Sequence, residues 1–200
     1  LTVPVGVNAS HGRTQHTLNV NYSRTTNRSA SQYAGAEDIA GVAGIGGVST
    51  DPFDWGVPTL SFSTFSGVRD QAATRRTDQR VSVTYSWVRP SQKHALRIGG
   101  EYRRDWSNSR SDSNARGSFT FTGLYASGLK TSVPRGGYDF ADYLLGLAQS
   151  ATRQFGPGDV RLTNTAFSLY LQDDWRPNAS TTVSYGVRYE LAPPYVETNG

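Results

Sequence analysis

The sequence predicts an all-β protein built from antiparallel strands. Apolar and polar residues alternate along much of the chain, and a period of two places successive side chains on opposite faces of a strand. Hydrophobic residues make up 36% of the 200 residues, with 21 Gly and 11 Tyr, which is typical of β-proteins with long polar loops. No run of about 18 apolar residues is present, which excludes a transmembrane helix but not membrane-spanning strands of about 9–11 residues.

The clearest pair of strands lies in residues 167–190, where two alternating runs flank the polar connector 175–180. The connector contains Pro and Asn, which favour turns, so the two runs predict an antiparallel hairpin. Two environments fit its apolar face: a sandwich core, with the polar face in solvent, or lipid, with the polar face lining a wet lumen. The apolar face comprises Phe167, Leu169, Leu171, Val183, Tyr185, Val187 and Tyr189.

The N-terminal part alternates in the same way after a short extended lead at 3–7. Residues 14–24 predict a strand, and 25–78 form a long excursion rich in Ser, Gly and Ala. Compact domains usually join their elements by about 4–6 residues, so this connection indicates a functional loop. The alternation of 59–65 suggests a strand within the loop.

A second hairpin repeats the layout of the first. It consists of 80–88, the Pro-containing turn 89–93, and 94–104. Beyond it, 106–116 is polar and predicts a loop, and 118–125 predicts a strand.

The period of two breaks at 138–147, where apolar residues at helical spacing predict one short helix of about two turns. Asp139 is placed to cap its start, and 148–155 resume as a strand. The residues at helical spacing are Phe140, Tyr143, Leu144 and Leu147.

These strands can be ordered as a barrel wall in which tight turns share one rim and long loops the other. With the turns 89–93 and 175–180 on one rim, the strands alternate in direction without contradiction, provided that 59–65 belongs to the loop. In this arrangement 118–125 and 148–155 are wall strands, and the helix lies at the turn rim. This consistent alternation of strand directions favours a barrel wall, although the meander of a β-sandwich would also show it.

The carboxylate pair of Asp173 and Asp174 is the most chemically suggestive feature of the chain. Neighbours in a strand face opposite sides, so the two carboxylates do not converge on one substrate atom or ion. We expect a structural role near a turn, in ion pairs with Arg176 or Arg188.

Other candidate sites are also weak. His11, His16 and His94 are far apart in sequence, which disfavours a zinc site, and the glycine-rich 41–49 lacks the Lys-Ser/Thr ending of a phosphate loop. The absence of Cys excludes disulfides. The net charge of +4 is spread over scattered Arg residues, which disfavours a nucleic-acid partner. We therefore predict no catalytic residue, no metal site and no cofactor.

The polar faces and the strand ends carry two further patterns. Arg and Glu on the polar faces are expected to form cross-strand ion pairs that line a lumen, and Trp near the turns is expected to form an interfacial girdle. The ion-pair residues are Arg97, Glu101, Arg103, Arg188 and Glu190, and the girdle residues are Trp87 and Trp175.

The run LYLQDDWRPNASTTVSYGVRYE (169–190) resembles the hairpin of TonB-dependent outer-membrane receptors, whose strands often read aromatic-x-Q-D-D-W, a short turn, then G-x-R-Y-E. Further stretches resemble the Oar-like subgroup, which carries an N-terminal carboxypeptidase-regulatory-like domain. These stretches are STDPFDWGVPTLSFSTF (49–65), SWVRPSQKHALRIGGEYRR (86–104), RSDSNARGSFTFTGLYAS (110–127) and YDFADYLLGLAQSATRQFG (138–156).

The resemblance implies a large transmembrane β-barrel of about 22 strands with a plugged lumen. With about seven or eight strands and neither plug nor TonB box, residues 1–200 are expected to be a partial barrel domain. We expect an open, curved sheet with long extracellular loops and one short helix, in the outer membrane of a Gram-negative-type bacterium.

By the same resemblance, the protein would take up a nutrient across the outer membrane. Its partners would be outer-membrane lipid, the extracellular nutrient, and the TonB complex acting through the plug domain. The expected substrate contacts are Tyr33, Phe53 and Trp55, since binding residues concentrate in loops. The competing class is a soluble, secreted β-sandwich that serves in binding or adhesion.

Overall fold

The computed structural model describes residues 1–112, 114–128, 138–154 and 158–198. The chain folds as two compact units, which we call the wall unit and the loop unit. The wall unit comprises Leu1–Thr26, Arg76–Asn108 and Val160–Gly200, and the loop unit comprises Asn27–Arg75 and Ser109–Asp159. No helix among the described residues is both long and apolar enough to cross a membrane.

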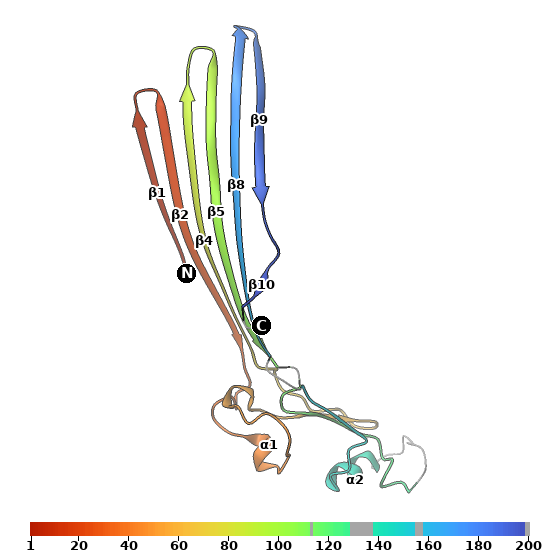
Figure 1. The fold of residues 1–200 in the computed structure, drawn as a ribbon. Coiled ribbons are helices and arrows are strands. Elements are labelled where there is room, and N and C mark those ends of the chain that lie inside the picture. The colour runs from red at the N-terminus through yellow and green to blue at the C-terminus, as the bar shows by residue number, and fades with distance from the viewer. Residues whose placement is uncertain (113, 129–137, 155–157, 199–200) are drawn as a thin grey trace. The chain divides into compact units, whose positions relative to one another are not determined.

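The wall unit is built on a seven-stranded sheet (Figure 1). Neighbours in the order β1-β2-β4-β5-β8-β10 are hydrogen-bonded, and β9 also pairs with β8. The strands are β1 (Thr2–His11), β2 (Thr14–Ser29), β4 (Thr74–Pro90), β5 (His94–Ser111), β8 (Asp159–Asn178), β9 (Thr181–Leu191) and β10 (Val196–Glu197).

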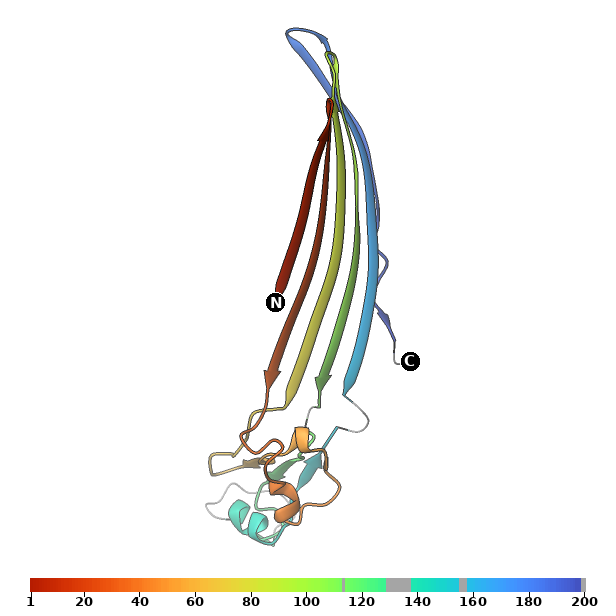
Figure 2. The same cartoon turned by 90° about the vertical axis from the view of Figure 1, so that its left-hand side faces the viewer.

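Tight turns close the hairpins β1–β2, β4–β5 and β8–β9 at one end of this sheet (Figure 1). Gly12 adopts a φ of +60° in the first turn, a left-handed conformation that Gly reaches without steric cost. The prediction that the turns 89–93 and 175–180 share a rim is therefore confirmed, and the turn after β1 joins them. Figure 2 shows the wall strands bending together, as expected for an open, curved sheet.

The strand register separates an apolar face from a polar face. In β8–β9, Leu169 lies opposite Tyr189, and Leu171 lies opposite Val187. On the other face, Ser168 lies opposite Glu190. In β1–β2 the matching apolar pairs are Val3 with Tyr22, Val5 with Val20, and Val7 with Leu18.

The apolar face is exposed, with Leu169 at 60% and Val187 at 67% accessibility. Such a face is unstable in water, because apolar surface of this extent is normally buried. The face is therefore suited to lipid and does not pack as a sandwich core.

The loop unit contains a small three-stranded sheet, β3-β6-β7. Its elements are α1 (Ile39–Val42), a 3₁₀ turn at Pro52–Asp54, β3 (Thr59–Phe62), β6 (Ser118–Phe121), α2 (Tyr138–Leu144) and β7 (Ser150–Thr152). β3 and β6 are parallel, and β6 and β7 are antiparallel. The predicted helix at 138–147 is observed as α2, and the predicted strand at 59–65 is observed as β3.

The core of the loop unit is aromatic. The Phe62 and Phe121 rings stack at 5.5 Å, and Tyr143 of α2 meets both edge-on at 5.7 and 5.4 Å. Phe121 is 5% exposed, so this cluster holds α2 against the small sheet.

Two carboxylates fasten α2 to neighbouring loops. Asp139 accepts hydrogen bonds from the Thr64 backbone N at 2.6 Å and from its hydroxyl at 2.7 Å. Asp142 accepts one from the Ala126 N at 2.7 Å. Both side chains are fully buried. The N–H and hydroxyl donors therefore take the place of the water that would otherwise solvate each carboxylate. Asp139 lies inside the first turn of α2, so its main role is to hold Thr64.

Three predictions about these segments are wrong. The strands predicted at 118–125 and 148–155 are not wall strands, because β6 and β7 pair within the loop unit. The helix lies in the loop unit and not at the turn rim. Period-two patterns identify strands but not partners, and the β3–β6 pairing joins segments that are distant in the sequence. Residue 155, at the end of the second strand, lies outside the described residues.

Strand bounds also differ at the ends of the wall strands. The lead at 3–7 is part of the ten-residue β1, and β5 extends to Ser111, into the predicted loop 106–116. Residue 113 of that predicted loop lies outside the described residues. Polar residues near the ends of these strands weakened the alternation on which the sequence prediction depends.

Candidate functional site

The candidate site lies in the loop unit and begins with the turn at 51–55. Asp51 caps the 3₁₀ turn by accepting a hydrogen bond from the Phe53 N at 2.9 Å. Pro52 follows the cap, where its fixed φ suits the start of a helical turn. This local order places Asp51, Phe53 and Asp54 in fixed positions around one short turn.

Arg110, near the end of β5, gathers three carboxylates. Its Nη2 lies 2.8 Å from Asp51 and 3.2 Å from Asp54, and its Nε lies 3.2 Å from Asp112. The Arg110 side chain is only 20% exposed, so these charge-assisted hydrogen bonds are partly shielded from solvent. Residues 49–54 and 110–112 are thereby joined into one polar cluster.

Asp54 is the most buried member of the cluster, at 3% exposed. Its Oδ2 accepts a hydrogen bond from the Ser49 hydroxyl at 2.7 Å, while its Oδ1 is buried and has no partner among the described residues. Burial raises the pKa of Asp54 above its usual value, although the Ser49 hydrogen bond and Arg110 act in the opposite direction. The Phe53 N–H and then Arg110 lower the pKa of Asp51.

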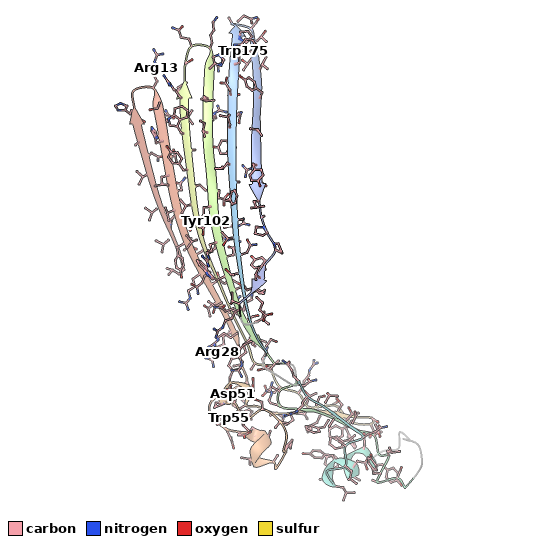
Figure 3. The ribbon with its side chains drawn as sticks, in the orientation of Figure 1. Arg13, Arg28, Asp51, Trp55, Tyr102 and Trp175 are labelled. Carbon is pink, nitrogen blue, oxygen red and sulfur yellow. The ribbon has the colours of Figure 1, made fainter. Side chains whose placement is uncertain are left out.

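The Phe53 ring supports this arrangement by packing against two guanidinium groups. The guanidinium carbon of Arg110 lies 4.4 Å from the ring centroid, and that of Arg28 lies 6.0 Å from it. Both distances fit cation–π contacts. Figure 3 labels Arg28, Asp51 and Trp55 in this region.

An open pocket of about 390 Å³ lies beside the cluster. Carboxylates outnumber guanidinium groups in its lining, so it offers mainly hydrogen-bond acceptors. A ligand that donates through hydroxyl or ammonium groups would complement this lining. The pocket is lined by Ser49, Asp51, Asp54, Arg110, Asp112, Ala115, Arg153, Gln154, Gly158 and Asp159.

A second polar centre braces the loop unit at Asp70. Its carboxylate lies 3.1 Å from the Arg116 Nη1 and accepts hydrogen bonds from the Ser31 hydroxyl and from the Val57 N. Burial raises the pKa of Asp70, but these donors and the charge of Arg116 outweigh it, so the pKa is lowered overall. This centre joins three segments of the loop unit.

The three expected substrate contacts lie around the same turn. Phe53 and Trp55 belong to it, and Tyr33 is near, because the Gly35 N donates to the Pro52 carbonyl at 2.8 Å. The Trp55 Nε1 donates to the Thr50 carbonyl at 3.3 Å, and Phe53 packs against guanidinium groups. None of the three lines the pocket, so their role in substrate contact stays a prediction.

Sequence reasoning missed the residues that do line the pocket, chiefly Asp51, Asp54, Arg110 and Asp112. The only signal was the recurrence of Asp in 51–54 and beside Arg in 110–112. Nothing in the sequence indicated that these two short segments meet.

In the wall unit, the carboxylates of Asp173 and Asp174 do point to opposite faces, as predicted. Asp173 accepts hydrogen bonds from the Tyr185 hydroxyl at 2.9 Å and bonds with the His94 Nδ1 at 2.6 Å. Asp174 pairs with Arg97 at 3.2 Å. The predicted partners Arg176 and Arg188 were wrong, because the ion-pair partners His94 and Arg97 come from β5, the strand beside β8.

Ion pairs on the polar face are observed, in part between other residues than predicted. Asp105 pairs with Arg80 of β4 at 2.6 Å and with Arg103 at 3.2 Å, while Arg188 pairs with Glu190 within β9. Cross-strand pairing on this face is therefore confirmed for Arg97, and Arg103 takes a partner on its own strand. Asp105 is 5% exposed, so these two guanidinium groups take the place of water beside its carboxylate.

The histidines lie apart in the fold. His16 bonds with the Tyr85 hydroxyl at 2.8 Å, and His94 bonds with Asp173. Within the described ranges, no group of three or more His, Cys, Asp or Glu side chains is arranged to hold a metal ion.

Comparison with known families identifies the architecture. The family described as outer membrane beta barrel domain matches residues 6–200. The chain belongs to this outer-membrane β-barrel family. Its wall unit is therefore a segment of barrel wall in the outer membrane, with the apolar face toward lipid and the polar face toward the lumen. The soluble β-sandwich alternative is wrong. A search of curated proteins found no match to the chain.

Proposed function

We propose that this chain is the barrel segment of a TonB-dependent receptor that takes up a nutrient across the outer membrane, and that the loop unit captures the nutrient on the extracellular side. The observation that carries this proposal is the built polar cluster around Arg110, next to an open pocket of about 390 Å³. In barrels of this kind the short turns are periplasmic and the long loops extracellular. The long connections of this wall form the loop unit.

The polar cluster favours a receptor over a purely structural wall. Holding Asp54 nearly fully buried beside two other carboxylates is costly unless the charges are paired. A loop that only joins two strands does not require such an arrangement, whereas a rigid pocket is a general property of ligand sites.

The chemistry of the pocket suggests its ligand class. Asp51, Asp112 and Asp159 offer acceptors, and Gln154 offers an amide. A small nutrient with several hydroxyl or ammonium groups fits these acceptors. Tyr33, Phe53 and Trp55 would contribute contacts at the edge of the same region, and the role is binding and transport without catalysis.

The link to TonB is supported by the resemblance of 169–190 to the receptor hairpin with its Gln172-Asp173-Asp174-Trp175 run. In this proposal the TonB complex acts through a plug domain, and nutrient captured by the loop unit passes along the polar face of the wall. The ion pairs of Asp105 and Asp174 keep that face polar and hydrated.

The test is growth of a strain that lacks the full-length protein on a panel of sole carbon sources and iron chelates. Complementation with the wild-type protein should restore growth on at least one nutrient, and loss of TonB should abolish it again. Asp112→Asn should reduce uptake of that nutrient severalfold, while Arg69→Gln, an exposed change outside the pocket, should not. Growth that needs the protein but not TonB would point instead to a passive pore.

A further inference from the structure

The tight-turn rim of the wall unit carries a concentration of positive charge. Arg13 lies in the β1–β2 turn, Arg89 and Lys93 flank the β4–β5 turn, and Arg176 precedes the β8–β9 turn. All four side chains are exposed. Residues 11–14, 89–94 and 176–181 contain no Asp or Glu. We call these four residues the cationic rim.

The fold brings these cations side by side. The strand order places the three hairpins next to each other, and the Arg176 N donates to the Lys93 carbonyl at 2.7 Å. Neighbouring strands lie about 4.8 Å apart, so consecutive turns are spaced by roughly 10 Å. The cationic rim is thus a continuous row across the end of the sheet where the tight turns lie.

The nearby carboxylates do not neutralise this row. Asp173 is held by His94 and Tyr185, and Asp174 pairs with Arg97. Among the residues that the structure describes, no carboxylate forms an ion pair with a member of the cationic rim. Four cations therefore remain available to an external anion.

Amphipathic rings beside the rim fix its depth relative to the membrane. Trp175 stacks on His94 with ring centroids 6.4 Å apart, and His16 bonds with Tyr85. The register places Trp175 on the apolar, lipid-facing side. Figure 3 shows Arg13 and Trp175 at the turn end of the wall and Tyr102 along a strand. Trp and Tyr prefer the membrane–water interface, so the rim lies at headgroup level.

We propose that the cationic rim binds the phosphate groups of anionic glycerophospholipids in the membrane leaflet on the tight-turn side. Phosphate is the anion found at this depth, and Arg matches it with paired donors while Lys offers a mobile charge. His94, fixed by Asp173 and stacked on Trp175, adds a further polar ring at the same level. The rim thereby anchors the barrel edge at a defined depth.

The experiment uses the full-length protein in detergent, titrated with phosphatidylglycerol or phosphatidylcholine that carries brominated acyl chains, which quench Trp fluorescence on contact. Each cation near an anionic surface adds about a fivefold preference. Lys93→Gln with Arg176→Gln should therefore weaken the preference for phosphatidylglycerol at least about fivefold. Phosphatidylcholine binding should change little, and added salt should reduce the wild-type preference.

The matched control combines Arg69→Gln with Arg75→Gln, which makes the same charge change at exposed positions of the loop unit. Heat-modifiable gel mobility shows whether each variant folds. If the first variant fails to fold, Arg13→Gln with Arg89→Gln tests the same rim. An unchanged lipid preference in a folded rim variant would overturn the proposal, and so would an equal loss in the control variant. Binding of the rim to a periplasmic protein and not to phosphatidylglycerol would also overturn it.

Discussion

Asp173 and Asp174 are consecutive in the sequence and bind partners on opposite faces of the wall. Asp173 lies on the apolar face with His94 and Tyr185, and Asp174 lies on the polar face with Arg97. The cause is the alternation of side chains in a strand. Asp173 therefore lies on the lipid side of the wall and Asp174 on the lumen side, so the loss of each should change the stability of the barrel by a different amount.

Replacing Asp173 with Ala should destabilise the barrel more than replacing Asp174 with Ala. Loss of Asp173 removes the acceptor of both His94 and Tyr185, whereas Arg97, the ion-pair partner of Asp174, faces a hydrated lumen. Urea unfolding of the full-length protein in vesicles compares the two variants. Equal losses would show that the two faces do not differ in this way.

Leu169 should not tolerate a charge. It lies on the exposed apolar face, well within β8, so Leu169→Arg should cost roughly 2–4 kcal/mol of unfolding free energy if it sits near the bilayer midplane. Tyr170→Arg is the control, because Tyr170 faces the polar side opposite Arg188. The same urea unfolding in vesicles measures both, and a larger cost at position 170 would reverse the assignment of the two faces.

Arg110→Ala should loosen the turn at 51–55. The change leaves Asp51, Asp54 and Asp112 without their shared cation, and losing hydrogen bonds to charged groups costs about 1.5–3 kcal/mol. Hydrogen exchange should speed up in 49–58 and remain unchanged in β8. Arg75→Ala, an exposed change, serves as the control, and unaltered exchange in 49–58 would mean that the cluster does not hold the turn.

Phe121→Ala should unfold the loop unit locally. Phe121 is 5% exposed and packs against Phe62 and Tyr143, and removal of a buried Phe typically costs about 3–5 kcal/mol. Phe65 is 50% exposed, so Phe65→Ala should cost much less. Limited proteolysis of intact cells carrying each variant reports the difference, and equal cleavage would place the core elsewhere.

Acidification should release Thr64 from α2. Burial raises the pKa of Asp139, but the Thr64 and Phe140 donors outweigh it and lower the pKa below its ordinary value of 3.8. Because the pKa of Asp139 is lower in the folded state than in the unfolded state, its carboxylate stabilises the fold fully at pH values above 3.8. This stabilisation is lost as the pH falls through the lower pKa of the folded state.

Hydrogen exchange around residue 64, corrected for the intrinsic effect of pH, measures this release. It should accelerate only in the acid range below pH 4 or so, and Asp139→Asn should remove most of the dependence. Acceleration already near neutral pH would contradict the lowered pKa.

The hairpins and the two faces of the wall were predictable because they depend on local rules. Alternation in 167–190 and 80–104 fixed which side chains share a face, and Pro-containing turns fixed where the chain reverses. The family resemblance rested on the same hairpin, and the match over residues 6–200 supports its coarser part, an outer-membrane barrel.

The loop unit was predictable only as a loop with a strand inside it. Its sheet joins Thr59–Phe62 in parallel with Ser118–Phe121, and its pocket joins Asp51 and Asp54 to Arg110 and Asp112. Such pairings depend on which segments meet in space, and a four-residue strand carries too little pattern to choose its partner.

The sequence by itself determined the strands, the tight turns and the amphipathic faces of this protein, since periodicity and turn chemistry act between near neighbours. The tertiary structure alone decided that β6 and β7 leave the wall, that α2 packs on β6, and that Asp173 takes His94 as its partner. The physical reason is that these choices depend on long-range packing and on the pairing of buried charges, which no local pattern encodes.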